Sequence, residues 1–302
     1  MNLQAVLAHE FAPIEQRYGW RDAALYALSL GFGADPLDAD ELPYVYEGYE
    51  RGQWGGKGRL RAVPSLAVTL AWVPFWQDDP ALAIDWERIV HGEMRFTLHR
   101  PLACEARLRA THRIAAVHDK GAGRGAVMHV DKTLHDAGSG EPLASLRSVE
   151  FLRGDGGCGS WGEAREALAP LPEHFAPDVH ADYSTARSAA LLYRLASGDL
   201  MPIHADPAVA LRAGFDRPIS HGLNNLGLAC RAVLEHFARG APERIVEMGV
   251  RFVQPGLPGD TVRVELQSDG ACVRFRARAL ERDVPLLDRG YARLAPAQPS
   301  VP

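Results

Sequence analysis

The sequence predicts an α+β fold built from two successive units, each with an antiparallel sheet curled around a helix. In both halves of the 302-residue chain, a helical stretch precedes a series of strand-like segments. Between them, a stretch rich in Gly and Pro lacks sustained periodicity, which is typical of a linker. We therefore expect a first unit over 1–153, a linker over 154–182, a second unit over 183–296 and a tail over 297–302. The two units repeat the order of elements only, without a convincing match between residues.

The first unit opens with a helix at Trp20–Leu30, where apolar residues recur at helical spacing. Gly31 and Gly33 follow this helix as stop signals. A mixed, apolar segment predicts a second, buried helix over 65–75. The strands that we expect, separated by Gly-rich turns, are 95–98, 103–116, 125–134 and 143–152.

The second unit contains helix candidates over 185–196 and 220–237. The longer one has several large apolar side chains to bury, among them Leu223, Leu226 and Phe237. The strands that we expect after it are 244–254, 261–268, 271–280 and 287–294. A long helix followed by antiparallel strands indicates a sheet that curls around the helix.

The composition excludes several classes of protein. Hydrophobic residues make up 47% and charged residues 24%, and the net charge is −5, so a broad basic face for nucleic acid is not expected. No run of about 18 apolar residues predicts a membrane span, and neither end carries a signal peptide or a peroxisomal tripeptide. The 4 cysteines are scattered without metal-ligand spacing. We therefore expect a cytoplasmic protein without a metal site.

The segment from Tyr193 to Pro207 carries the clearest chemical signal. Asp199 follows Gly198, and His204 comes five residues later, in a loop that proline makes stiff. Asp206 is expected to cap a new helix. Such a loop can direct a carboxylate and an imidazole to one point, as general acid–base catalysis requires. On this string alone, the alternative is that the aspartate is a cap and the histidine is solvated.

The segment FDRPISHG, residues 215–222, precedes the long helix. The first turn of a helix leaves N–H groups free, and these suit a carbonyl oxygen that gains negative charge. Gly222 would let a substrate approach the backbone closely. Ser220 could instead act simply as the helix cap, and both roles are compatible.

A second glycine-rich stretch, 121–126, loosely fits the dinucleotide-binding pattern GxGxxA. That pattern requires a helix directly after the glycines. Here AVMHVDKTLHD alternates like a strand, so we reject a nicotinamide site.

The run ALLYRLASGDLMPIHADPAVALRAGFDRPISHGLNNLG, residues 190–227, resembles the signature of MaoC-like (R)-specific enoyl-CoA hydratases. These include the hydratase unit of the peroxisomal multifunctional enzyme of β-oxidation. The segment 250–261 continues the similarity. In the N-terminal half, YGWRDAALYALSLGFG, ELPYVYEG, IVHGEM and HDKGAGRGAV are similar to the degenerate first repeat of double hot-dog members. The resemblance covers nearly the whole chain.

The resemblance implies a double hot-dog fold and a lyase that acts in fatty acid metabolism. The implied reaction is the reversible syn hydration of trans-2-enoyl-CoA to (3R)-hydroxyacyl-CoA. It implies no cofactor beyond the CoA of the acyl-CoA substrate, and a homodimer as the assembly.

The resemblance also implies roles for individual residues. Asp199 and His204 match the acid–base pair, and Gly222 matches the backbone donor to the thioester oxygen. We favour Asp199 as the base toward water and His204 as the proton donor, although coupled groups leave these roles open. The residues expected on the CoA side are Arg251, Lys120, His91, Gly92 and Asn224.

One departure from the family pattern is Met201, which stands where the family usually has Asn. Methionine offers only a weak acceptor, so Asn224 or Asn225 is a candidate to supply the missing hydrogen bond. Two alternatives to the hydratase remain open, the first because of Met201 and the second because a fold alone does not fix a reaction. One is an acyl-CoA-binding protein that has lost catalysis, and the other is a hot-dog thioesterase.

Overall fold

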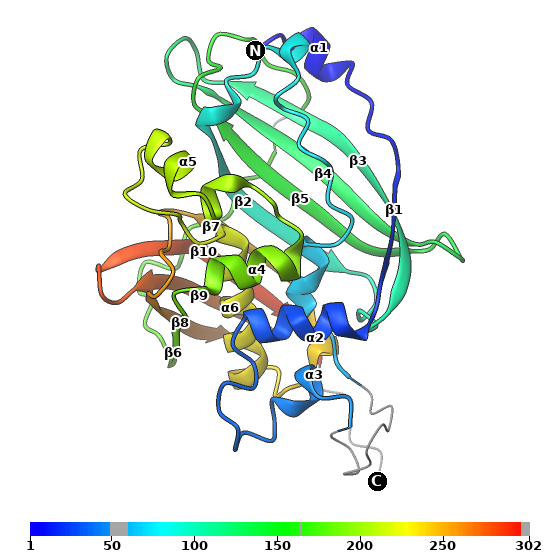
Figure 1. Ribbon diagram of the computed structural model, residues 1–302, viewed down its shortest axis with the longest axis vertical. Helices are drawn as coiled ribbons and strands as arrows, with labels where there is room; N and C mark the ends of the chain where they lie inside the picture. Colours follow the sequence, from blue (N-terminus) through cyan, green and yellow to red (C-terminus); the bar gives the residue numbers. More distant parts are fainter. Residues whose placement is uncertain (49–59, 164, 297–302) are drawn as a thin grey trace.

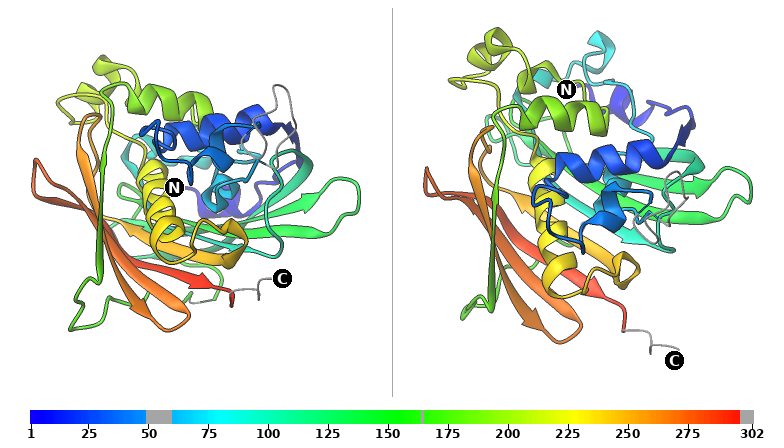
Figure 2. Two further views of the ribbon diagram at one scale, coloured as in Figure 1. Left: turned by 90° about the horizontal axis from the view of Figure 1, so that it is seen from below. Right: turned by 60° about the horizontal axis from the view of Figure 1, so that its bottom comes forward.

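The computed structural model describes residues 1–48, 60–163 and 165–296, so the expected tail lies outside the described residues. The described strands form one antiparallel sheet in the order β1-β3-β4-β5-β2-β7-β10-β9-β8-β6 (Figure 1). The strands are β1 Ile14–Tyr18, β2 Ile89–Leu98, β3 Ala106–Asp119, β4 Ala126–Asp136, β5 Pro142–Leu152, β6 Val179–Ser184, β7 Ile245–Phe252, β8 Thr261–Asp269, β9 Cys272–Ala279 and β10 Val284–Leu294. The sheet curls, and the longer helices lie on its concave side (Figure 2).

The sheet consists of two halves with the same internal order. From its outer edge, the first half runs β1-β3-β4-β5-β2, and the second runs β6-β8-β9-β10-β7. The halves meet where β2 pairs with β7, with Glu93 opposite Arg251 and Thr97 opposite Glu247. The prediction of two units with one order of elements is confirmed.

The α-helices are α1 Leu3–Leu7, α2 Trp20–Ser29, α3 Leu42–Val45, α4 Ala189–Ser197, α5 Pro207–Arg212 and α6 Gly222–His236. The helices α2 and α4 follow β1 and β6, occupy equivalent places in the two units and contact each other. The helix α6 contacts the strands β6 to β10 and is the central helix of the second unit. The three α-helices predicted over 20–30, 185–196 and 220–237 are therefore confirmed, with ends moved by a few residues.

The second helix that we predicted in the first unit is largely absent. Only η1, a five-residue 3₁₀ helix at Pro64–Val68, forms there, and the chain then crosses the sheet without regular structure as far as η2. The other short 3₁₀ helices are η2 Pro80–Leu82, η3 Trp86–Arg88, η4 Pro202–His204 and η5 Pro242–Arg244. Residues 62–71 are all buried. Complete burial of this segment therefore accounts for its run of apolar residues, and no helix is needed to explain that run.

The crossing segment is tied to the sheet by a buried lysine. The ammonium of Lys132, on β4, donates hydrogen bonds to the carbonyls of Val68 (3.3 Å) and Leu70 (2.8 Å). Burial lowers the pKa of Lys132 to about 7. The first unit thus covers its sheet with an anchored, irregular segment where the second unit has α6.

The two outermost strands were not predicted. β1 and β6 have only five and six residues, and β6 begins within the expected linker. β2 also begins at Ile89, earlier than the predicted 95–98. None of the described helices is long and apolar enough to cross a membrane.

Candidate active site

The loop between α4 and α5 is as tight as predicted. α4 ends at Gly198, which has a φ of +73° and donates its amide to the carbonyl of Arg194. The amide of Met201 then donates to Asp199 Oδ1 at 3.1 Å. Thus the backbone of Met201, rather than its side chain, holds this carboxylate. Asp206 caps α5 by accepting from the amides of residues 208 and 209, as predicted.

His204 is fixed by a hydrogen bond that sets its tautomer. Its Nδ1 lies 2.8 Å from the carbonyl oxygen of Ile219. Because a carbonyl oxygen only accepts, Nδ1 carries the proton, and Nε2 of the neutral ring has a free lone pair. Burial lowers the pKa of His204, which favours this neutral form. The imidazole is therefore arranged to take a proton at Nε2.

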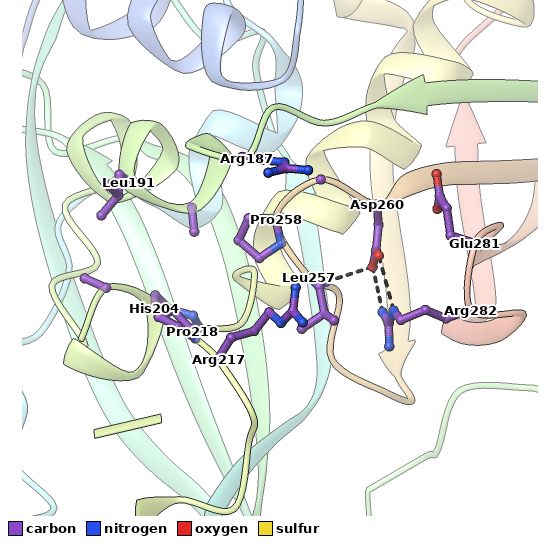
Figure 3. A pocket seen from close by; sticks show the side chains of 13 residues that line it. Arg187, Leu191, His204, Arg217, Pro218, Leu257, Pro258, Asp260, Glu281 and Arg282 are labelled. Atoms are coloured by element: carbon purple, nitrogen blue, oxygen red, sulfur yellow. Dashed lines mark hydrogen bonds and ion pairs between the residues drawn. The ribbon is translucent and has the colours of Figure 1, made fainter. Parts of the chain in front are cut away.

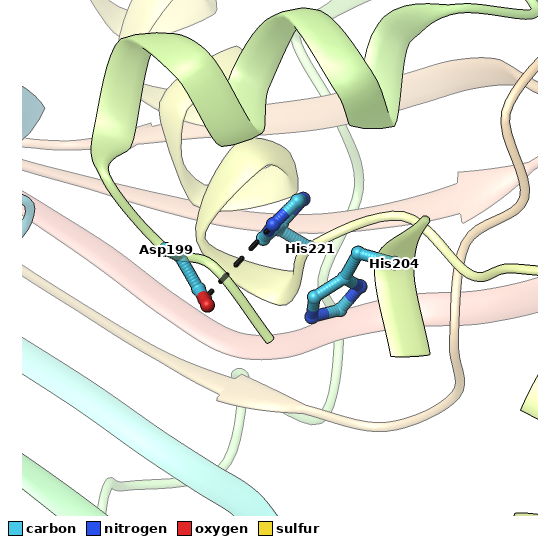
Figure 4. Close-up of side chains that lie close together, drawn as sticks. All are labelled: Asp199, His204 and His221. Atoms are coloured by element: carbon cyan, nitrogen blue, oxygen red, sulfur yellow. Dashed lines mark ion pairs between the residues drawn. The ribbon is translucent and has the colours of Figure 1, made fainter. Parts of the chain in front are cut away.

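A third side chain, His221, joins the pair (Figure 4). One ligand atom each from Asp199, His204 and His221 lies within 4.8 Å of the others. Two hydrogen bonds to one water molecule span a gap of about this size. The arrangement can therefore hold a water molecule between a carboxylate and an imidazole.

His221 was not singled out from the sequence. Its ring stacks on that of His204, with centroids 3.7 Å apart and an interplanar angle of 25°. Its Nε2 lies 4.0 Å from Asp199 Oδ2, and the side chain is 1% exposed. Burial, followed by the neighbouring His204, lowers the pKa of His221 to about 3. The signal that could have revealed it is its place directly before Gly222 in a segment already considered functional.

The same three groups are a possible metal site by residue type. A metal ion would require the in-plane lone pairs of both imidazoles to converge on one point. The stacked rings instead keep these lone pairs in two separate planes, which are 25° from parallel with ring centroids 3.7 Å apart. The geometry therefore suits a shared water molecule or proton better than a metal ion.

Gly222 is the first residue of α6, so its amide belongs to the helix end that lacks intrahelical acceptors. A Cβ at this position would lie 3.0 Å from a ring carbon of Phe252. The alternative role for Ser220 as the helix cap is wrong, because His221 occupies the cap position. The Ser220 amide instead donates to the carbonyl of Gly256.

A pocket of about 590 Å³ has His204 in its wall. Figure 3 shows Arg187 and Arg217 among the side chains that line it. Both arginines are exposed. Arg282 also lines the pocket, but two of its nitrogens are bound to Asp260. The wall of the pocket therefore contains His204 and two exposed guanidinium groups.

Comparisons with known proteins agree with this geometry. The MaoC like domain matches residues 173–288, and the MFE-2 hydratase 2 N-terminal domain matches residues 17–154. The peroxisomal enoyl-CoA hydratase 2 of Arabidopsis thaliana is 33% identical over 96% of this chain and 94% of its own length. Among solved structures, a MaoC-like dehydratase from Phytophthora capsici has a TM-score of 0.83 and 28% identity, with 99% of this chain and 100% of that chain covered.

The chain belongs to the MaoC-like hydratase 2 family. Within it, the chain is also similar to a longer relative, the peroxisomal multifunctional enzyme type 2 of Drosophila melanogaster. The two are 31% identical over 94% of this chain and 47% of the relative. The structure of that full-length enzyme gives a TM-score of 0.76. The double hot-dog fold that the resemblance implied is thereby confirmed.

In this hydratase 2 family member, the residues expected on the CoA side are dispersed. Arg251 lies on β7, and its guanidinium is 3.2 Å from the buried Glu93. Lys120 follows β3 and lies over the ring of Phe151. Neither of these two cations lines the 590 Å³ pocket.

Two further expected residues lie on β2. His91 shares a hydrogen bond of 3.0 Å with Ser148, and Gly92 follows it at a bulge. His91 also packs against Phe252, so it is close to Gly222.

The two asparagines on α6 are both buried. The amide of Asn224 donates to the carbonyl of Ser29, on α2, at 3.4 Å. Asn225 lies beside Gly256. Hence the hydrogen bond of Asn224 is directed to α2 rather than to the acid–base pair.

Proposed function

We propose that this protein is an enoyl-CoA hydratase and 3-hydroxyacyl-CoA dehydratase that uses Asp199 and His204 as its acid–base pair. The observation that carries the proposal is the short gap between the carboxylate and the imidazole, which one water molecule can bridge. Gly222, at the start of α6, supplies an N–H group for the thioester oxygen. The product of hydration is the (3R)-hydroxyacyl thioester, as in the family that the chain resembles.

The tautomer of His204 favours a division of roles opposite to the one that we preferred from the sequence. Nε2 of His204 takes a proton from water while the oxygen adds to the β-carbon of the substrate. Asp199 accepts a hydrogen bond from the other O–H of that water and orients the molecule. The proton that His204 has taken then passes through Asp199 to the α-carbon on the same face, so that addition is syn. Dehydration follows the same steps in reverse.

We further propose that Arg187 and Arg217 bind the phosphates of CoA. Both are exposed in the wall of the pocket that His204 lines. Guanidinium groups bind phosphate oxygens through charge-assisted hydrogen bonds. The acyl end of the substrate would then reach the acid–base pair from this pocket.

Location and assembly are further proposals. A cytoplasmic location is consistent with four cysteines that form no disulfide, although the Arabidopsis thaliana relative is named peroxisomal. A homodimer is the assembly that the resemblance implies. Fractionation of the source cells and the sedimentation mass of the purified protein test these two statements.

The decisive experiment follows the absorbance of crotonyl-CoA during hydration. We expect Asp199→Asn and His204→Ala each to reduce kcat by roughly 10² to 10⁴. The matched control is Asp206→Asn, which keeps a capping side chain on α5 in the same loop. Wild-type rates in either of the first two variants would refute the assignment.

The same assay separates the alternatives. Binding of crotonyl-CoA without any change in absorbance would indicate an acyl-CoA-binding protein. Release of free CoA thiol in place of hydration would indicate a thioesterase. Chiral analysis of the 3-hydroxyacyl product checks the (3R) configuration.

A further inference from the structure

A row of polar side chains crosses the concave face of the first half-sheet. It consists of His91 on β2, Ser148 and Glu150 on β5, and Gln77 from the crossing segment, and we call it the polar row. His91 Nε2 and Ser148 Oγ lie 3.0 Å apart, and Gln77 Nε2 donates to Glu150 Oε2 at 3.1 Å. His91 is directly opposite Glu150 in the β2–β5 ladder, so their side chains share a face.

The polar row begins at the candidate active site. The ring of His91 lies 4.7 Å from that of Phe252, which in turn packs against Gly222. Burial lowers the pKa of His91 to about 4, and the charge of Asp199 acts on the same imidazole in the opposite direction. Glu150 lies one strand farther from the site, about 5 Å beyond His91. The row therefore leads away from the reacting atoms along one face of the sheet.

Neither the acid–base chemistry nor the packing of the sheet requires this row. On the same face of β5, Leu146 and Leu152 are buried apolar residues, as expected where a sheet covers a core. Glu150 interrupts them, and burial raises its pKa to about 7. No cation among the described residues forms a salt bridge with Glu150. A carboxyl group in such a place costs free energy unless it has hydrogen-bonding partners.

The polar row also remains partly accessible. His91, Ser148 and Glu150 each keep part of their surface exposed, although desolvation shifts the pKa of both titratable members. Gln77 supplies a single hydrogen bond, whereas a carboxyl group can make several. Glu150 therefore has hydrogen-bonding capacity left for a bound molecule.

We propose that the polar row is a subsite for a hydroxyl group carried on the acyl chain of the substrate, with Glu150 as its main partner. This inference rests on the proposed hydratase function and names its substrate class. A hydroxyl group both donates and accepts, so it can bind Glu150 in either protonation state, and Ser148 is next to it on the same face. A second carboxylate would be repelled by Glu150, and an unbranched alkyl chain would leave the carboxyl group without a partner.

The test compares medium-chain trans-2-enoyl-CoA esters with and without a terminal hydroxyl group, at several chain lengths. For one chain length, we expect wild-type kcat/KM to be roughly tenfold or more higher for the hydroxylated ester than for its alkyl analogue. Glu150→Leu should abolish this preference, and Glu150→Gln should retain part of it. The matched control is Glu141→Leu, at an exposed position directly before β5. This variant should keep the wild-type preference.

Crotonyl-CoA has only one carbon beyond the reacting double bond and is too short to extend along the polar row to Glu150, so it reports the acid–base pair separately. If the wild type did not hydrate crotonyl-CoA, the proposed function itself would fail. If the wild type hydrated it but showed no preference for the hydroxylated esters, the subsite alone would be refuted. Equal losses with all substrates in Glu150→Leu would assign Glu150 to anchoring the crossing segment and would also overturn the proposal. Should this variant not fold, competition by saturated hydroxyacyl-CoA and acyl-CoA in Glu150→Gln gives the same comparison.

Discussion

The imidazole of His204 stacks on that of His221, with ring centroids 3.7 Å apart. His221 is buried and its pKa is lowered to about 3, so it presents a neutral ring at physiological pH. The ring of His221 covers one face of the His204 imidazole and keeps water away from that face. Because His221 is neutral, it places no positive charge beside His204. Burial lowers the pKa of His204 as well. The stack therefore helps to keep His204 in the neutral form that can accept a proton.

Loss of the stacked ring should alter the pH dependence of hydration. His221→Ala opens space beside His204 and admits water, which raises the pKa of His204 toward its ordinary value. The neutral form of His204 then disappears at a higher pH as the solution is acidified. We expect the acidic limb of kcat/KM against pH to move to higher pH, and kcat to fall roughly tenfold or more.

His221→Phe distinguishes the effect of the stacked ring from the effect of the ring nitrogens of His221. It keeps an aromatic ring against His204, so the acidic limb should remain near its wild-type position. A profile for His221→Ala that coincides with the wild-type profile would mean that the stack does not influence His204.

The proximity of Asp199 and His204, the proposed acid–base pair, could be predicted from the sequence because the two residues lie in one short loop. Gly198, Pro202 and the capping Asp206 determine that loop locally, and the structure places the two side chains as the spacing suggested. His221 could not be found in this way, since its contact with His204 depends on how α6 packs. The carbonyl of Ile219, which sets the tautomer of His204, is equally a tertiary feature.

The fold could be predicted to a similar extent. The long helix α6 was predicted from its length and its large apolar side chains, and 11 of its 15 residues are buried. The edge strands β1 and β6 have only five and six residues, and each has only one neighbouring strand. β6 does alternate in burial, but it begins inside the Gly- and Pro-rich stretch that was interpreted as a linker. A helix was wrongly predicted over 65–75 because residues 62–71 are all buried, so that their apolar character carried no information on periodicity.

Substrate affinity should depend on the arginines of the 590 Å³ pocket. We expect Arg187→Ala and Arg217→Ala each to raise KM for crotonyl-CoA severalfold with little change in kcat, because the role proposed for both side chains is to bind phosphate rather than the reacting atoms. The corresponding N-acetylcysteamine thioester has no phosphate and should show no such change. Arg263→Gln, at a cation already paired with Asp182, is the control.

The same KM measurements test Arg251, the cation that was expected from the sequence on the CoA side. Arg251→Ala should have less effect on KM than either pocket variant, since Arg251 is engaged with Glu93. Equal increases of KM for the CoA and N-acetylcysteamine thioesters in the pocket variants would exclude phosphate binding by Arg187 and Arg217.

The folded protein should lose stability in mild acid. Burial lowers the pKa of His204 and of four further histidines, to about 4 for His91, His112 and His129 and to about 3 for His221. Between about pH 6.5 and pH 4 the unfolded chain binds more protons at these positions, so the free energy of unfolding falls as the pH falls. The raised pKa of Glu150 acts in the opposite direction over part of this range, but the histidines outnumber it.

Urea unfolding at pH 7 and pH 5 measures this dependence. We expect a decrease on the order of a few kcal/mol in the free energy of unfolding at pH 5. His129→Gln should make the decrease smaller, whereas His174→Gln, at an exposed position, should not alter it. Equal stability at the two pH values would contradict the neutral state of the buried histidines.

A methyl side chain at position 222 should lower the hydratase activity while the protein still folds. In Gly222→Ala, the new Cβ lies 3.0 Å from the ring of Phe252 and must displace it, together with its contact to His91. The ring of Phe252 needs to shift by only a few tenths of an ångström, so the variant should still fold, and urea unfolding checks this. Hydration should nevertheless fall roughly tenfold or more, because the amide that faces the thioester oxygen is obstructed. Phe252→Leu in the same background makes room and should restore part of kcat/KM. If Gly222→Ala kept the wild-type kcat/KM, the thioester oxygen could not lie at the start of α6.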